Sequence, residues 1–140
     1  MQLPRPEKPC RPPLWAKSGY LQSALGNYLP KPKLTQPWRR EEIHLPDGDR
    51  LVARVYAPKE GSAPPNRKTV ICVFHGLGGH GDRPYMQRVV DLGTARGCEV
   101  FSVDHRGCGQ GRGLAKGIYH SGVAADLSSV FSELRRRQPD

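Results

Sequence analysis

Four short stretches of the sequence have the hydrophobic pattern of β-strands. Residues 70–74 are consecutive apolar side chains, which predicts a strand buried on both faces, and residues 99–103 form a second, mostly apolar strand. Residues 41–45 and 51–56 flank Pro46-Asp47-Gly48-Asp49, and Asp-Gly is a strong hairpin-turn signal. Because the pattern alternates within 51–56, we expect that strand to be antiparallel and half exposed.

Helical periodicity follows each of the last two strands. Apolar spacing over residues 85–97 predicts one helix, with helix-start chemistry from Asp82 and Pro84. A second helix is expected from Ser121, its N-cap, to the basic residues 135–137, whose charges suit the carboxyl end of a helix dipole. The order of hairpin, strand, helix, strand and helix predicts an α/β fold, in which an antiparallel hairpin leads into a parallel sheet with flanking helices.

The first forty residues differ from the rest in composition. Prolines are frequent in residues 1–40, which predicts an irregular arm, and residues 41–140 are expected to form an incomplete α/β domain. Within the arm, Gly19–Tyr28 is expected to hold a short helix. Trp15 and Trp38 are the expected anchors of the arm onto the body.

The net charge of +9 is compatible with an anionic partner, but the basic residues are scattered along the chain. We therefore expect no nucleic-acid partner.

The four cysteines, Cys10, Cys72, Cys98 and Cys108, show neither a C-x-x-C pair nor zinc spacing. With no signal peptide and no apolar run of membrane-spanning length, we expect an intracellular, cytoplasmic protein.

Two binding chemistries fit the glycine-rich loop that follows residues 70–74. The glycines at 76, 78 and 81 match the dinucleotide fingerprint G-x-G-x-x-G, and Asp104 ends the next strand, where an acid would hold a ribose. Against this hypothesis, Asp82 and Pro84 place the start of the helix after the third glycine. Dinucleotide binding is therefore ranked third among the functions considered.

The second chemistry is an oxyanion hole. A strand that ends in His75-Gly76-Leu77 would present the Leu77 N–H to a developing negative charge. The alternative is a plain structural turn.

His80, Asp82, Asp104 and His105 carry side chains that can bind a metal ion. Their spacing matches no known ligand pattern, so no metal site is predicted.

Several motifs occur in the order found in one family of enzymes. They are Arg11-Pro12-Pro13-Leu14-Trp15, Gly19-Tyr20-Leu21-Gln22-Ser23, Leu45-Pro46-Asp47-Gly48-Asp49, His75-Gly76-Leu77, Tyr85, Ala95-Arg96-Gly97, Asp104-His105-Arg106-Gly107-Cys108-Gly109, Tyr119-His120-Ser121-Gly122 and Asp126-Leu127. On these motifs, residues 11–138 resemble the amino-terminal half of YheT-like α/β-hydrolases, a branch of serine esterases. Two features depart from the family pattern: Tyr20 stands where the family usually has histidine, and the loop after Leu77 is unusually rich in glycine.

The resemblance implies a partial α/β-hydrolase fold, truncated before the strand that carries the nucleophile. It implies the amino-terminal part of a carboxylic-ester hydrolase, with His75, Gly76 and Leu77 as the oxyanion loop and no cofactor. Asp104, Arg106, Tyr119 and His120 are expected in the site wall or in structural roles.

The catalytic residues of such an enzyme are missing from this sequence. It contains no G-x-S-x-G elbow, so the catalytic triad is absent, and a catalytically inactive vestigial or binding domain is the alternative function. If further sequence completes the site, the expected substrate is a small or lipid-like ester. The open sheet edge is expected to favour self-association or binding of a chaperone.

Overall fold

The computed structural model describes residues 13–28, 35–65 and 69–137. Contacts divide the chain into two units, Met1–Lys31 and Pro32–Asp140. In the first unit, a 3-10 turn, η1 (Leu14–Lys17), precedes the helix α1 (Gly19–Tyr28). The short helix predicted in the arm is therefore confirmed. The Gln22 side chain donates a hydrogen bond to the Ala16 carbonyl within this unit.

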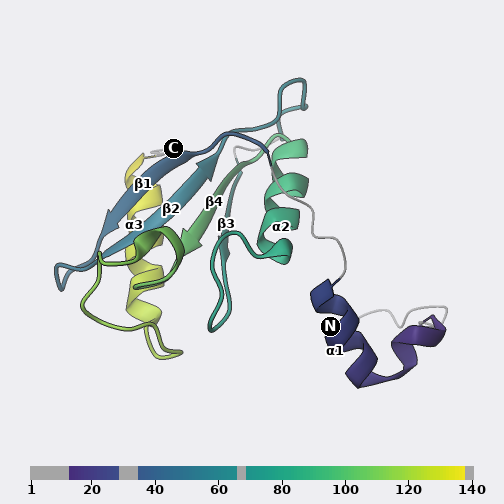
Figure 1. Ribbon diagram of the computed structural model, residues 1–140. Coiled ribbons are helices and arrows are strands. Elements are labelled where there is room, and N and C mark those ends of the chain that lie inside the picture. Colours follow the sequence, from purple (N-terminus) through teal and green to yellow (C-terminus); the bar gives the residue numbers. More distant parts are fainter. Residues whose placement is uncertain (1–12, 29–34, 66–68, 138–140) are drawn as a thin grey trace, which may run out of the picture. The chain divides into compact units, whose positions relative to one another are not determined.

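The second unit contains a four-stranded sheet with the order β1-β2-β4-β3 (Figure 1). Its strands are β1 (Arg39–His44), β2 (Arg50–Tyr56), β3 (Val70–Phe74) and β4 (Glu99–Asp104). The pairs β1–β2 and β2–β4 are antiparallel, and β3 and β4 are parallel. The predicted mixed α/β sheet with an antiparallel hairpin entrance is confirmed.

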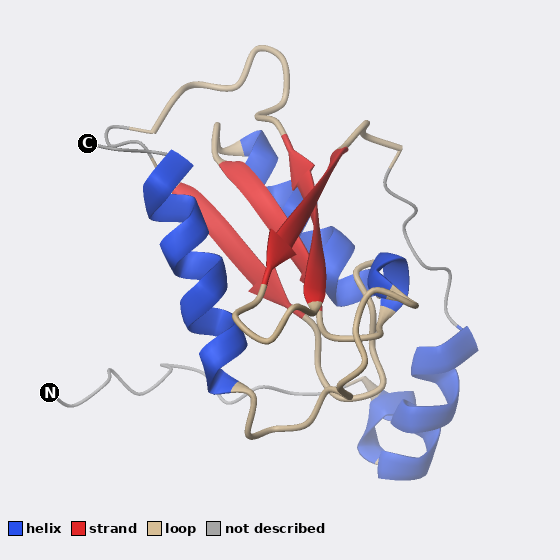
Figure 2. Ribbon diagram, turned by 90° about the vertical axis from the view of Figure 1, so that its left-hand side faces the viewer, coloured by secondary structure: helices blue, strands red, loops and turns tan. Residues whose placement is uncertain are grey.

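Two helices cover opposite faces of the sheet (Figure 2). Val90 of α2 (Pro84–Ala95) packs with Tyr56 and Val100 on one face. Val130 of α3 (Ala124–Arg137) packs on the other face, in the larger core cluster. That cluster also contains Ile43, Leu45, Leu51, Ala53, Val55, Phe101 and Val103.

The burial of β2 and β3 differs from the prediction. In β2 every residue after Arg50 is buried, because the strand lies between β1 and β4 with both of its faces covered. All five residues of β3 are only half buried, because β3 is an edge strand that pairs with β4 alone among the described residues. An apolar run cannot reveal whether a strand is central or at an edge, since strand order is a tertiary property.

The helix boundaries are partly as predicted. Pro84 is the first residue of α2, and Gly97 follows its end with φ of +75°. A Cβ atom at position 97 would clash with the Ala63 carbonyl oxygen, so glycine is needed there for space as well as conformation. The prediction of Ser121 as the N-cap of the last helix is wrong: residues 121–122 form a turn, and α3 begins at Ala124.

Candidate functional site

Two glycine-rich loops follow β3 and β4, and their origins are neighbours because the strands are parallel, with Phe74 beside Val103. In open α/β sheets ligands bind beyond the carboxyl ends of such strands. A cavity of about 540 Å³ lies between the two loops. Its lining includes Gly78, Gly79 and His80 from the first loop and Gly107, Cys108 and Arg112 from the second.

Asp104 joins the two loops from below. Its carboxylate, fully buried at the end of β4, accepts the Gly81 N–H at 2.7 Å and the Gln110 N–H at 2.9 Å. The guanidinium of Arg54 lies 3.3 Å from the same carboxylate. Asp104 therefore ties both loops to β2 from a buried position.

Arg54, which the sequence pattern placed on the exposed side of a half-buried strand, is 1% exposed. It forms a bidentate ion pair with Asp82, at 2.6 and 3.0 Å, and Trp38 lies over it with 5.5 Å between the guanidinium carbon and the ring centroid. Asp82 therefore holds Arg54, and the start of α2 has no side-chain cap. The signal for this role was an arginine flanked on both sides by apolar residues of the strand, since an arginine is almost never fully buried unless it is paired.

His75 and His105 form a reciprocal pair between the ends of β3 and β4. The His75 Nε2 accepts the His105 backbone N–H at 3.1 Å, while its Nδ1 lies 2.8 Å from the Gly76 carbonyl. Both ring nitrogens of His75 are therefore engaged by backbone groups. The His105 Nε2 lies 3.1 Å from the His75 carbonyl, so the pair ties the two strand ends together.

The Gly76–Gly79 segment is a tight turn that follows β3. The Gly79 N–H donates to the Gly76 carbonyl at 2.9 Å, and Gly78 has φ of +69°, the combination typical of a type II turn. The Gly76 N–H donates to the Tyr85 hydroxyl at 2.8 Å. In the part of the chain that the structure describes, the Leu77 N–H has no hydrogen-bond partner, and the Leu77 side chain is 82% exposed.

The four residues expected in the site wall have different surroundings. Asp104 is buried below the loops. Arg106 binds Asp126 in α3 and both aspartates of the hairpin turn. The Tyr119 ring stacks on His105 with 3.9 Å between centroids, and His120 is exposed and accepts the Gly122 N–H. Of these four residues, Tyr119 stacks on the histidine pair, and the Asp104 carboxylate lies 4.0 Å from the His75 Nε2.

These contacts argue against the other chemistries considered for the loop. Asp104 has no exposed surface with which to hold a ribose, and the third glycine, Gly81, donates its N–H to that buried carboxylate. Among the described residues no group of three or more His, Cys, Asp or Glu side chains is arranged to hold a metal ion. Asp82, a member of the metal cluster considered above, is instead paired with Arg54.

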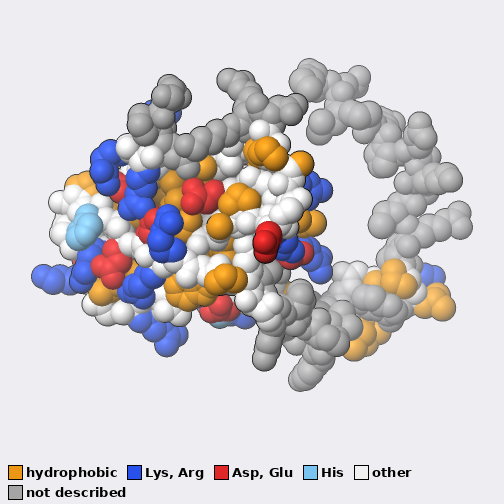
Figure 3. Space-filling model, turned by 90° about the horizontal axis from the view of Figure 1, so that it is seen from above, with side chains coloured by type: hydrophobic (Ala, Val, Ile, Leu, Met, Phe, Trp, Pro, Cys, Tyr) orange, Lys and Arg blue, Asp and Glu red, His pale blue; other side chains and the backbone are white. Residues whose placement is uncertain are grey.

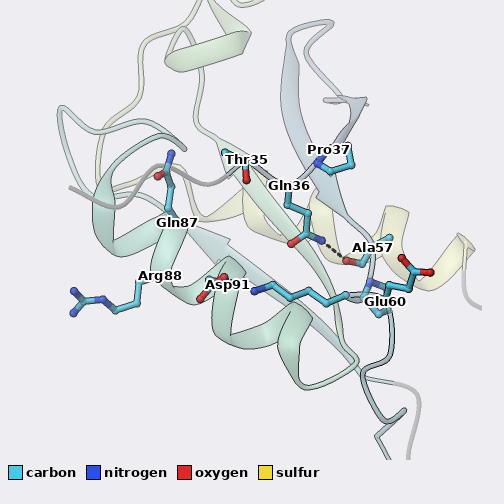
Figure 4. Close-up of a pocket in the computed structure, with 10 residues that line it drawn as sticks. Thr35, Gln36, Pro37, Ala57, Glu60, Gln87, Arg88 and Asp91 are labelled. Atoms are coloured by element: carbon cyan, nitrogen blue, oxygen red, sulfur yellow. Dashed lines mark hydrogen bonds and ion pairs between the residues drawn. The ribbon is translucent and has the colours of Figure 1, made fainter. Parts of the chain in front are cut away.

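A second hollow, of about 670 Å³, lies at the other end of the sheet (Figure 4). Its wall combines Gln87, Arg88 and Asp91 of α2 with residues 35–37 and the segment after β2. The Gln36 side chain donates to the Ala57 carbonyl at 2.6 Å, and Lys59 pairs with Asp91 at 2.5 Å. β2 ends beside Val100, near the start of β4, whereas the glycine-rich loops follow the ends of β3 and β4.

On the face seen in Figure 3, basic and acidic side chains are interspersed, with hydrophobic groups between them. This mixture agrees with the scattered positions of the basic residues along the sequence. None of the helices in the described ranges combines the length and the apolar character that crossing a lipid bilayer requires.

Comparison with known proteins was made by family and by sequence. No protein-family model matches the chain. Over 104 residues it is 36% identical to the "Putative esterase YheT" of Escherichia coli (strain K12). This chain is a distant relative of YheT. The predicted resemblance to YheT-like α/β-hydrolases is thereby confirmed.

The match to YheT covers 74% of this chain but only 29% of YheT. A stretch of 104 residues in a chain of 140 necessarily includes residues 37–104. The resemblance to YheT therefore spans all four strands, α2 and the Gly76–Gly79 turn. Because the match covers less than a third of YheT, the four-stranded sheet is only part of the fold of a protein of that length.

His105 should make the stability of the protein sensitive to mild acid. Burial, and secondly the neighbouring His75, lower the pKa of His105 below its ordinary value of 6.5, although Asp104 and Asp126 oppose this shift. Since the unfolded chain then binds a proton more readily, the free energy of unfolding should fall as the pH drops below 6.5. Each pH unit should cost up to about 1.4 kcal/mol while folded His105 stays neutral.

Urea unfolding between pH 7 and pH 5 measures this effect. His105→Gln should flatten the pH dependence, whereas His44→Gln, a change at an exposed position of β1, should leave it as in the wild type. Equal slopes for the wild type and His105→Gln would show that His105 is not the responsible group.

Proposed function

We propose that this chain supplies the oxyanion-loop part of a carboxylic-ester hydrolase. The observation that carries the proposal is the unpartnered Leu77 N–H, displayed by a tight turn beyond the carboxyl end of β3. In ester hydrolysis the carbonyl oxygen gains negative charge, and backbone N–H groups fixed in advance stabilise that charge. The relationship to a protein named as an esterase supports the same chemistry.

The surroundings of the turn keep this N–H in place. The Tyr85 hydroxyl accepts the Gly76 N–H, and the Arg83 guanidinium donates to the Gly78 carbonyl at 3.2 Å. The His75 Nδ1 contacts the Gly76 carbonyl at 2.8 Å. The turn therefore has three side-chain supports, and a donor fixed in this way needs little reorganisation when charge develops beside it.

The remaining catalytic groups must come from outside these 140 residues, because no G-x-S-x-G elbow is present. In the complete reaction a serine would attack the ester carbonyl, with a histidine accepting the serine proton and an acid orienting that histidine. The substrate would be a small or lipid-like carboxylic ester. The alternative is that the domain has lost catalysis and serves for binding.

Leu77→Pro tests the proposed donor directly. Proline removes the N–H, and it is favoured at the second position of a type II turn, so the turn itself should persist. In YheT carrying the matched segment of this chain, Leu77→Pro should lower kcat for short-chain p-nitrophenyl esters by roughly 10²–10³-fold. Leu77→Ala keeps the N–H and should stay within a few-fold of the chimera.

Two further results bear on this test. Equal kcat values for the proline and alanine variants would exclude Leu77 as an oxyanion donor. The 140-residue chain alone should neither hydrolyse the ester above a buffer blank nor react with a fluorophosphonate serine probe. Labelling that Ser121→Ala abolishes would identify Ser121 as a nucleophile and contradict the proposed division of roles.

A further inference from the structure

Arginine side chains gather around the cavity between the two glycine-rich loops. Arg54, Arg83 and Arg112 line this cavity, and Asp82 is the carboxylate in its described lining. Asp104, which is buried below the loops, contacts Arg54 and brings the count to three cations and two carboxylates. The balance of charge around the cavity is therefore positive.

Both carboxylates are already bound to the same arginine. The Arg54 guanidinium forms ion pairs with Asp82 at 2.6 Å and with Asp104 at 3.3 Å. Arg83 and Arg112 are exposed, and neither forms an ion pair with a carboxylate of the described residues. The contact of Arg83 is with a backbone carbonyl, which carries no net charge. These two guanidinium groups are therefore available to an anion that enters from solvent.

The cavity has the size and the open walls that a small ligand requires. Its volume of about 540 Å³ lies within the roughly 300–1,000 Å³ of ligand pockets in proteins. A Cβ atom at Gly78 or Gly107 would meet no other atom within 4 Å, so the glycines of both loops leave this space open. The walls belong to β2 and to the loops after β3 and β4, which are paired with each other, so the cavity does not depend on a free edge of the sheet.

A buried donor also borders the cavity. The Arg54 side chain is 1% exposed, and its Nε has no hydrogen-bond partner within the part of the chain that the structure describes. Buried N–H groups without a partner are rare in proteins. An oxygen atom of an anion in the adjoining cavity is a chemically suitable acceptor for this group.

We propose that this cavity binds an anionic group of the ester substrate, a carboxylate or a phosphate that is separate from the ester itself. The inference rests on the proposed ester-hydrolase function, because Gly78 belongs both to the turn that displays the Leu77 N–H and to the lining of the cavity. Guanidinium groups bind carboxylates and phosphates through paired N–H donors. With the ester carbonyl at the Leu77 N–H, the charged end of the substrate would lie between Arg83 and Arg112.

The test has to separate this site from the general attraction of a chain with a net charge of +9 for anions. Arg112 and Arg88 provide the matched pair of variants. Both side chains are exposed, but Arg112 lines the cavity between the loops, whereas Arg88 lines the hollow beside α2. Replacing either arginine with alanine removes the same charge from the chain.

NMR titration of the 140-residue chain with inorganic phosphate and, separately, with glutarate measures the binding at constant ionic strength. Saturable shifts are expected at the amides of Gly79, Gly107 and Gly109, which line the cavity. Arg112→Ala should raise the Kd about 5-fold, the upper end of the range for solvent-exposed ion pairs. Arg88→Ala should leave the Kd as in the wild type.

The anion with the lower Kd identifies whether the substrate carries a phosphate or a carboxylate. If neither anion gave saturable shifts, the cavity would not be an anion site. An equal rise of the Kd in Arg112→Ala and Arg88→Ala would also overturn the proposal, since it would show that net charge alone attracts the anion.

Ester kinetics connect the anion to the substrate. In YheT carrying residues 37–137 of this chain, the ester with the more tightly bound anion should be preferred over 4-nitrophenyl pentanoate. That ester is mono-4-nitrophenyl glutarate for a carboxylate, or its phosphonate counterpart for a phosphate. Arg112→Ala should lower the ratio of the two kcat/KM values about 5-fold, and Arg88→Ala should preserve it. An unchanged ratio in Arg112→Ala would refute the assigned substrate class.

Leu77→Pro separates this proposal from the oxyanion proposal. Leu77 does not line the cavity, so the proline variant should bind phosphate and glutarate as the wild type does. Anion binding that persists while Leu77→Pro leaves kcat unchanged would refute the oxyanion donor alone. A loss of kcat in Leu77→Pro without saturable anion binding to the wild type would refute the anion site alone.

Discussion

Replacing Asp104 with asparagine is expected to lower the free energy of unfolding by about 3–5 kcal/mol. The carboxylate has no exposed surface and compensates the buried guanidinium of Arg54, while also accepting the N–H groups of Gly81 and Gln110. An asparagine NH₂ group would turn a donor toward one of these donors, so a buried polar group would lose its partner. Since domains are stable by about 5–15 kcal/mol, the loss would be a large part of the total.

Urea unfolding of purified Asp104→Asn measures the loss, and Asp82→Asn is the matched control. Asp82 binds the same Arg54, but its side chain is 55% exposed, so water can replace much of the lost contact and the effect should be well below that of Asp104→Asn. Hydrogen exchange adds a local readout: the amides of Gly81 and Gln110 should exchange faster in Asp104→Asn. If the two variants lost equal stability, Asp104 would not be the group that joins the loops.

The parts of the fold that the sequence predicted are those with local signals. Asp-Gly between two strands identified the β1–β2 hairpin, Pro84 and Gly97 bracketed α2, and an apolar run identified β3. Each of these signals acts within a few residues of the chain. The start of α3 was missed because Ser121 and Gly122, the last two residues of a family motif, form a turn before the helix.

Burial could not be predicted in the same way, because it depends on which strands become neighbours. The alternating pattern of β2 indicated one exposed face, but on that face Val90 of α2 packs with Tyr56, and Trp38 and two aspartates enclose Arg54. Arg54 is for this reason a buried cation and not a surface residue. Strand order placed β3 at the edge, which a run of apolar residues does not reveal.

The glycine-rich loop follows β3 as the sequence predicted, but the contacts that support this loop were not predicted. The hydroxyl of Tyr85, the buried Asp104 and the reciprocal His75–His105 pair all hold the loops from other elements. Contacts of this kind join residues that are distant in sequence, so spacing within one motif contains no information about them. Asp104 illustrates this best. Its position at the end of a strand was compatible both with an acid that binds a ribose and with an acid that has a structural role.

Arg106 connects three separate segments of the fold. Its guanidinium binds Asp126 of α3 through two contacts of 2.7 and 2.8 Å, and Asp47 and Asp49 of the hairpin turn at 2.5 and 2.7 Å. The Arg106 side chain is 11% exposed and that of Asp126 is 4% exposed. Because the guanidinium meets carboxylates, chiefly Asp126, the pKa of Arg106 is raised and its charge is permanent.

Replacing Arg106 with alanine should cost about 3–5 kcal/mol of unfolding free energy, because it leaves Asp126 buried without its counter-charge. Lysine should restore only part of the loss, since an ammonium group cannot reproduce the fork geometry. Arg112→Ala, at an exposed position of the same loop, should leave the stability within error of the wild type. A lysine variant as stable as the wild type would show that charge alone, without the fork, accounts for the contribution of Arg106.

The acid dependence of the Arg106 variants should separate the two hairpin aspartates. A hydrogen bond from Arg106 is the main cause that lowers the pKa of Asp47, whereas the N–H groups of Lys116 and Gly117 are the main cause for Asp49. In Arg106→Ala the pKa of Asp47 should therefore return toward 3.8, and that of Asp49 should stay lowered. Because both folded-state pKa values lie below the unfolded ones, stability is lost as the pH falls through them, and the alanine variant should lose less of it below pH 4. NMR titration of the two carboxyl groups measures the difference, and equal shifts of both would contradict the assigned causes.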